Sequence, residues 1–145
     1  MTYKTQSGSF ALAAADFNRD DTLDIATANY KANNTSIFFG NGDGTVIEKK
    51  IISTGTRSFP YAIACSDLNR DNILELIVPN SGTGNIGILL GYGKGKFWKQ
   101  QTYSTGQGSS PQEIAVGDFN GDSRLDFVTV DYNQNSIGVF LSTCS

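Results

Sequence analysis

The sequence contains no histidine, and it has only two cysteines in 145 residues. Without histidine the chain cannot form Ser-His-Asp or Cys-His catalytic arrangements, and it lacks the commonest general base. A transition metal would find few of its preferred softer ligands. No apolar run approaches the length of a membrane span, and no basic stripe with interleaved aromatic residues suggests nucleic acid. We therefore expect no enzyme, no membrane insertion and no nucleic-acid partner.

The chain does contain three copies of one acidic nine-residue motif. The copies begin at Asp16, Asp67 and Asp118, so the repeat step is 51 residues both times. Positions 1, 5 and 9 of each copy are carboxylates and position 3 is Asn, and ten of the fourteen acidic residues lie in these copies. Crowded oxygens of this kind favour a hard cation, and Ca²⁺ fits best because it accepts six to eight oxygens in flexible geometry.

The predicted Ca²⁺ ligands are the side chains at positions 1, 3, 5 and 9 and the backbone carbonyl at position 7, which allows up to three ions per chain. In chain order these residues are Asp16, Asn18, Asp20, Thr22, Asp24, Asp67, Asn69, Asp71, Ile73, Glu75, Asp118, Asn120, Asp122, Arg124 and Asp126. Position 6 is expected in the left-handed conformation. An EF-hand is not expected, since position 12 is never Glu. The alternative is that the motifs are Asx-rich turns that hold no metal.

Stretches of strand-forming residues surround each motif. Expected strands cover residues 11–15, 36–39, 46–52, 61–65, 86–90, 97–103, 113–117 and 137–141, with a further strand directly after each acidic motif. Four antiparallel strands per repeat of this size are typical of a β-propeller blade. The prediction is an all-β chain of three blades, at about residues 6–52, 53–103 and 104–145, with residues 2–5 as a closing outer strand.

Three blades are too few to close a propeller ring, which typically needs four to eight. One possibility is that two chains close a six-bladed ring as a homodimer. The other is that the chain is a piece of a longer array.

Three segments carry a resemblance to a known family. They are Asp-Phe-Asn-Gly-Asp-Ser-Arg-Leu-Asp-Phe-Val at 118–128, Ala-Asn-Tyr at 28–30 and Phe-Phe-Gly-Asn-Gly-Asp-Gly-Thr at 38–45. Together they resemble FG-GAP or VCBS-type repeats, the calcium-binding blades of integrin α-chain propellers and of many secreted proteins. The resemblance implies Ca²⁺ at the three motifs, a role in adhesion or lectin-like binding, and an extracellular or secreted location. The chain departs from the family pattern at position 6, which lacks Gly, and at Glu75.

Strand alternation places the acidic motifs and the Gly-rich hairpins at one end of each blade. Loops at the opposite end carry aromatic and amide side chains, which suit sugars or polar peptides. The expected ligand residues are Tyr30, Asn33, Arg57, Phe59, Tyr61, Tyr132 and Asn133. The sequence therefore predicts a calcium-stabilised binding module for a carbohydrate or protein ligand. The alternatives are a structural spacer in a larger adhesin, or a fragment with no ligand of its own.

Overall fold

The computed structural model describes residues 1–143, apart from the side chains of Glu48 and Lys49. Thirteen strands lie in this part of the chain. Their bounds are β1 Ser9–Ala15, β2 Asp24–Asn29, β3 Asn34–Gly40, β4 Val46–Ser53, β5 Ala64–Ser66, β6 Glu75–Asn80, β7 Asn85–Leu89, β8 Gly91–Gly93, β9 Lys96–Phe97, β10 Gln101–Ser104, β11 Pro111–Gly117, β12 Asp126–Asp131 and β13 Ser136–Phe140. Over the same residues there is no helix that could cross a membrane.

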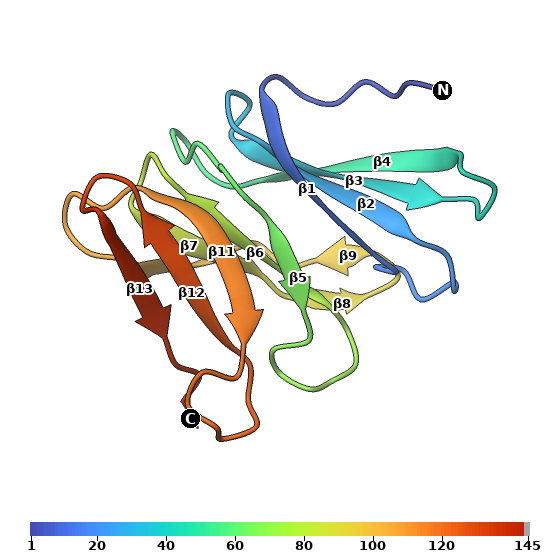
Figure 1. The fold of residues 1–145 in the computed structure, drawn as a ribbon. Helices are drawn as coiled ribbons and strands as arrows, with labels where there is room; N and C mark the ends of the chain where they lie inside the picture. The colour runs from blue at the N-terminus through green and yellow to red at the C-terminus, as the bar shows by residue number, and fades with distance from the viewer. Residues whose placement is uncertain (144–145) are drawn as a thin grey trace.

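The strands form three main antiparallel sheets and one short hairpin. The first sheet has the order β1-β2-β3-β4, the second β10-β7-β6-β5, and the third β11-β12-β13. Strands β8 and β9 pair only with each other. In Figure 1 the second sheet lies between the first, in blue and teal, and the third, in orange and red. The all-β prediction with antiparallel sheets is confirmed.

Pairing in the sheets follows the 51-residue step of the sequence. Ser9 pairs with Asn29 in the first sheet, and an isolated bridge joins Pro60 to Asn80 in the second. Pro111 then pairs with Asp131 in the third sheet. A register shift follows both Ser9 and Pro111, at the same place in the repeat. The register between the first and second strands is therefore the same in all three repeats.

Two hydrophobic clusters join the sheets. The first lies between the first and second sheets and includes Ile37, Leu76 and Leu89, all fully buried. The second lies between the second and third sheets and includes Ile77 and Ile86. Both faces of β6 are thus covered, so all six of its residues are buried, whereas burial alternates along β1 and β13. Burying each large aliphatic side chain contributes about 1.5–3 kcal/mol.

Two segments differ from the expected strands. The predicted strand at 61–65 is reduced to β5 because the chain bridges to the second sheet only through Pro60 before Ala64. The predicted strand at 97–103 is divided into β9 and β10, since only residues 101–104 pair with β7.

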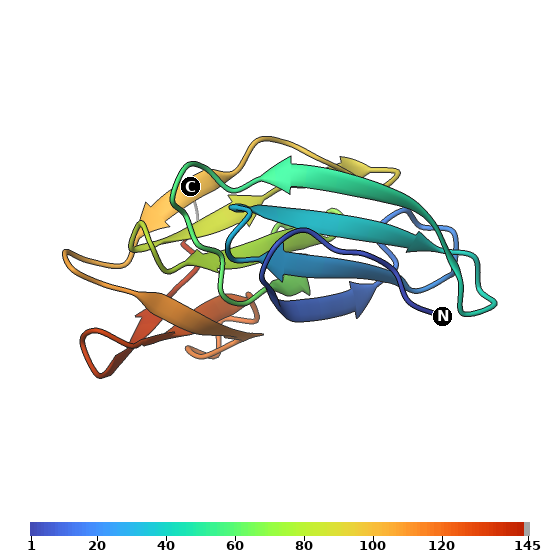
Figure 2. The same cartoon turned by 90° about the horizontal axis from the view of Figure 1, so that it is seen from above.

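Residues 1–5 form no strand in the single chain. They run towards the β3–β4 turn, where the backbone N–H of Val46 donates to the hydroxyl of Tyr3 at 3.3 Å (Figure 2). At the 51-residue step, residues 2–5 correspond to 53–56, of which only Ser53 lies in a strand. A closing strand formed by residues 2–5 across two chains stays a prediction.

Candidate calcium loops and an aromatic surface

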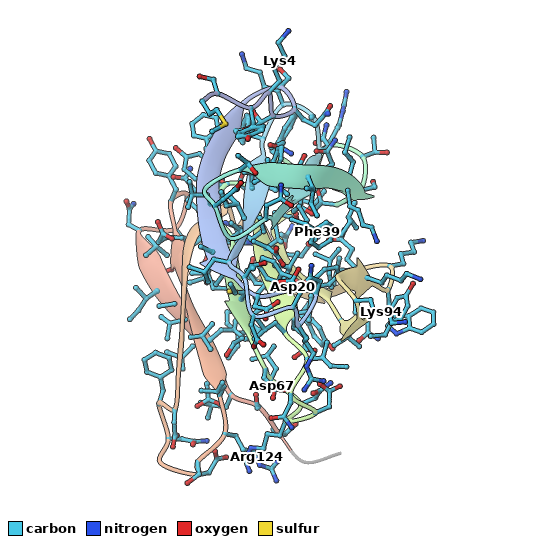
Figure 3. All side chains as sticks on the ribbon, turned by 90° about the vertical axis from the view of Figure 1, so that its right-hand side faces the viewer. Lys4, Asp20, Phe39, Asp67, Lys94 and Arg124 are labelled. Atoms are coloured by element: carbon cyan, nitrogen blue, oxygen red, sulfur yellow. The ribbon has the colours of Figure 1, made fainter. Side chains whose placement is uncertain are left out.

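The three acidic motifs are the turns between β1 and β2, β5 and β6, and β11 and β12. Each turn places two residues in the left-handed region, at positions 4 and 6. Their φ angles are 65° and 66° at Arg19 and Asp21, 63° and 65° at Arg70 and Asn72, and 78° and 66° at Gly121 and Ser123. The expected left-handed position 6 is confirmed, whereas position 4 was not anticipated. Figure 3 shows Asp20, Asp67 and Arg124 following one another along the molecule, away from Lys4.

The carboxylate at position 1 organises each turn. Asp16 Oδ1 accepts the backbone N–H of Arg19 at 2.6 Å, and Oδ2 accepts that of Asp21 at 2.8 Å. The bonds equivalent to the second one come from the N–H groups of Asn72 and Ser123, each at 2.8 Å. The two left-handed residues turn these N–H groups towards the carboxylate, which explains how the motif adopts one conformation three times.

Positions 3 and 5 form a second set of bonds. Asn18 Oδ1 accepts the N–H of Asp20 at 3.0 Å, and its amide donates to Asp20 Oδ2 at 2.8 Å. Asp20 Oδ1 accepts the N–H of Thr22 at 2.9 Å. The other two turns repeat all three bonds at 2.7–3.1 Å. Hydrogen bonds from the Thr22 hydroxyl and the Asn18 amide hold the pKa of Asp20 below its usual value.

The carboxylate at position 9 is buried and ties the turn to the sheet. Asp24 Oδ2 accepts the N–H of Phe17 at 2.8 Å, and its Oδ1 accepts the N–H of Gly40 at 2.9 Å. Asp126 accepts two equivalent backbone bonds at 3.0 and 2.8 Å. Both oxygens of each Asp therefore have a partner. Position 9 thus connects the start of the turn to the end of the third strand.

Glu75 breaks this pattern because its side chain is one carbon longer. Its Oε2 accepts the N–H of Leu68 at 2.8 Å, but Oε1 is buried without a hydrogen-bond partner among the described residues. Burial raises the pKa of Glu75, and the nearby Asp71 and Asp67 raise it further. Burial also raises the pKa of Asp24. The second turn therefore contains a buried carboxylate oxygen that a cation could satisfy.

The donor set fits Ca²⁺ chemically, because every turn offers carboxylate and amide oxygens and no soft ligand. In the structure, these oxygens already accept hydrogen bonds from backbone N–H groups of the same turns. Among residues 1–143, no three His, Cys, Asp or Glu side chains form a group that could hold a metal ion. A bound ion would therefore have to use oxygen lone pairs left over by these hydrogen bonds, or to reorient the carboxylates at positions 1 and 5.

The acidic turns and the glycine-rich hairpins lie at the same end of the sheets, as expected. The N–H of Gly95 in the β8–β9 turn donates to the carbonyl of Phe17 in the first acidic turn at 3.0 Å. The second and third turns also touch, since the Arg70 guanidinium donates to the carbonyl of Ser123. The Phe17 ring meets the Phe97 ring edge-on at 6.2 Å. These contacts join the first turn to the β8–β9 hairpin, and the second turn to the third.

Four aromatic rings gather at the opposite end of the first and second sheets. Tyr30 stacks on Phe59 with ring centroids 5.0 Å apart, and meets Tyr61 edge-on at 5.8 Å. Phe10 contacts Tyr30 at 5.2 Å and Tyr61 at 5.0 Å. We call Phe10, Tyr30, Phe59 and Tyr61 the aromatic cluster. Phe10 stays 55% exposed, whereas Tyr30, Phe59 and Tyr61 are half-buried.

The loop that carries Phe59 has an unusual backbone. Arg57 and Phe59 have φ angles of 56° and 47°, in a region that bulky residues rarely adopt. Asn33 Oδ1 accepts the N–H of Phe59 at 3.0 Å, and the Ser81 hydroxyl donates to the Phe59 carbonyl at 2.8 Å. A Cβ on Gly82 would overlap the Phe59 ring, so only glycine leaves room for it. Such strained positions persist where surrounding contacts hold them, and they often mark binding sites.

The structure thus places five of the seven expected ligand residues in or beside the aromatic cluster. Tyr30 contacts both Phe59 and Tyr61. Asn33 holds Phe59, and Arg57 lies two residues away in the same loop. Tyr132 and Asn133 lie instead on the third sheet, where Asn133 donates to the carbonyl of Gly108 at 3.2 Å. Phe10 was not anticipated. Its signal in the sequence is that it stands 51 residues before Tyr61.

The 51-residue repeats are similar to repeats of a known family. A search of curated proteins finds no match to the chain. The family model of the FG-GAP-like repeat matches twice, at residues 16–78 and 67–129. Each match runs from one acidic motif through the next, and together they cover more than half of the sequence. The chain therefore belongs to the FG-GAP-like repeat family.

Proposed function

We propose that this chain is a calcium-stabilised extracellular binding module, built of propeller-type blades, whose aromatic cluster recognises a carbohydrate or protein ligand. The observation that carries the proposal is the cluster of four contacting rings, with Phe10 exposed and Phe59 on a strained and well-anchored loop. Exposed aromatic rings stack well on the apolar faces of sugars and on peptide side chains. FG-GAP-like repeats are consistent with a binding or adhesion role.

The neighbouring polar groups add hydrogen-bonding capacity to this surface. Arg57 is exposed beside the cluster, and the phenol groups of Tyr30 and Tyr61 can donate and accept. Asn33 contributes by holding the loop, because its amide oxygen is already used by Phe59. We assign it a positioning role, while the rings and Arg57 would contact the ligand.

Ca²⁺ enters the proposal as a structural ion. The side-chain and carbonyl oxygens of the three acidic turns would hold it, and its charge would neutralise carboxylates that repel one another. Support comes from the buried, unpartnered Oε1 of Glu75 and from the raised pKa values of Glu75 and Asp24. The proposed extracellular location agrees with this chemistry, since sites of modest affinity fill at extracellular Ca²⁺ concentrations. No catalytic step is assigned to the chain.

The calcium claim is tested by thermal unfolding in excess chelator and then in millimolar Ca²⁺. An ion present at 100 times its Kd adds about 2.7 kcal/mol per site, so the melting temperature should rise clearly. Mg²⁺ serves as the matched control, because it prefers a rigid octahedral site and should give a smaller shift. An unchanged melting temperature in Ca²⁺ would contradict the claim.

The ligand claim is tested on an array of immobilised glycans and by capture of extracellular matrix proteins, with the calcium-loaded chain. Tyr30→Ala should abolish binding, because it removes the ring that contacts the other three members of the cluster. Tyr132→Ala is the matched control, since Tyr132 occupies the same place in the repeat two steps later. Equal losses in both variants would place the binding surface elsewhere, and no binding by the wild type would favour a spacer.

A further inference from the structure

The outward faces of the first and third sheets are apolar and exposed. Residues that pair directly across antiparallel strands share a face. On the first sheet this face includes Leu12, which is 67% exposed, together with Ile25 and Ile51. On the third sheet it includes Val139, which is 53% exposed, and Ile137. Figure 1 shows that these sheets lie at the two ends of the row.

The outward face of the first sheet matches faces that are buried in the other two sheets. At steps of 51 residues, Leu12 corresponds to Ile63 and Ile114. Ile63 belongs to the core between the first and second sheets, and Ile114 to the core between the second and third. In both cases the residue packs against the sheet that precedes it. Leu12 holds the same position on the first sheet and is exposed.

The outward face of the third sheet shows the complementary relation. Val139 corresponds to Ile88 and Ile37, which are buried in the second and first clusters respectively. Each of those residues packs against the sheet that follows it. Ile137 likewise corresponds to Ile86, which is fully buried. The third sheet therefore presents the surface on which a first-sheet face would pack.

We propose that two copies of this chain associate, with the first-sheet face of each packed on the third-sheet face of the other. A second copy carries the required surface by construction, because the contact repeats one that each chain already makes twice internally. Two such contacts related by a two-fold axis leave neither end face exposed. The inference rests on these faces and not on the proposed calcium sites or ligand.

The number of sheets agrees with an assembly of two copies. The described residues form three main sheets, two of four strands and one of three. Two copies would supply six sheets, which lies within the four to eight that closed rings of four-stranded sheets typically contain. Head-to-tail contacts that do not close would instead produce longer chains of molecules.

Light scattering on the whole chain tests the inference directly. A single mass near twice 15.6 kDa, constant over a tenfold range of concentration, is expected. A monomer at all concentrations overturns the proposal and leaves these faces to further repeats of a longer chain. Masses that grow with concentration overturn closure of the ring. The mass is measured in Ca²⁺ and again in chelator, which separates the dimer proposal from the calcium proposal. A dimer in Ca²⁺ supports the proposed faces even if chelator dissociates it, because chelator then acts through the stability of each chain.

Two substitutions that introduce opposite charges test which surfaces are in contact. Leu12→Glu and Val139→Lys each place a charge in an apolar contact, and each should raise the dimer dissociation constant about 100-fold or more. Mixing the two variants should restore a dimer, because one contact is then wild type and the other pairs Glu with Lys. Both positions are exposed in the single chain, so folding should be unaffected, which circular dichroism and thermal melting check.

A matched control uses an exposed apolar residue away from both end faces. Trp98 is 60% exposed and contacts Tyr92 in the region of the β8–β9 hairpin. Trp98→Glu should leave the dimer intact. Equal dissociation by Trp98→Glu, or failure of the mixture to restore the dimer, would overturn the assignment of the faces.

Discussion

Replacing the position-9 carboxylates by their amides should have opposite effects in the first and second acidic turns when Ca²⁺ is absent. Asp24 uses both carboxylate oxygens to accept backbone N–H groups, from Phe17 and Gly40. In Asp24→Asn one oxygen becomes an NH₂ group that faces an N–H donor. Glu75 uses only Oε2, so Glu75→Gln can keep that bond and change the unpartnered oxygen.

The magnitudes follow from what each substitution loses. Asp24→Asn removes one charge-assisted hydrogen bond, worth about 1.5–3 kcal/mol, and leaves a buried donor opposed by another. Relief of the buried charge offsets part of this, so we expect a loss of about 2 kcal/mol. Glu75→Gln breaks no bond and removes repulsion from Asp71 and Asp67. Its free energy of unfolding in chelator should therefore be unchanged or higher by up to about 1 kcal/mol.

Urea unfolding of both variants and the wild type, in chelator and again in millimolar Ca²⁺, measures these differences. In Ca²⁺ both variants should lose stability relative to the wild type, because each gives up a charged ligand. An equal loss of stability in chelator for Glu75→Gln and Asp24→Asn would refute this reasoning. It would mean that leaving Oε1 of Glu75 without a partner does not lower the stability of the wild type.

Two further predictions concern the rest of the molecule. Leu76→Ala, at a fully buried position between the first and second sheets, should lower the free energy of unfolding by about 2–5 kcal/mol in a denaturant titration. Burial alone would raise the pKa of Asp131, but hydrogen bonds from the Ser109 hydroxyl and from two backbone N–H groups outweigh it and lower that pKa below 3.8. Asp131 therefore stabilises the fold above that pH, and this contribution is lost as the pH falls through the lowered pKa. In Asp131→Asn, the melting temperature should fall less steeply as the pH is lowered through this range than it does in the wild type.

Much of the fold could be predicted because the sequence repeats itself. The 51-residue step of Asp16, Asp67 and Asp118 fixes equivalent strands, and the pairing of Ser9, Pro60 and Pro111 follows it. Strand lengths were less predictable. Only three residues of β5 pair with β6. β9 and β10 are separate because residues 98–100 lie outside the strands. Strand propensity does not show where a partner strand ends.

The acidic turns could be predicted in composition but only partly in conformation. Position 6 was expected to be left-handed because Asp21 and Asn72 tolerate it. Position 4 gave no such signal, since Arg19 and Arg70 stand where only the third repeat has Gly. Their conformation is imposed by the position-1 carboxylate, which collects N–H groups from several residues of the turn at once. A set of hydrogen bonds within the turn is invisible to the propensity of a single residue.

The aromatic cluster and the acidic turns lie at opposite ends of the first sheet, which limits how the proposed Ca²⁺ could influence the proposed ligand surface. β1 carries Phe10 near its start and Asp16 just after its end, about 20 Å apart at 3.3 Å per residue. Phe10 and Tyr30 come from the first sheet, whereas Phe59 and Tyr61 lie on the connection to the second. Their relative positions therefore depend on the apolar core between those sheets. Removing Ca²⁺ would weaken ligand binding by loosening this core, so affinity and stability should fall together, and a substitution in the core should mimic chelation.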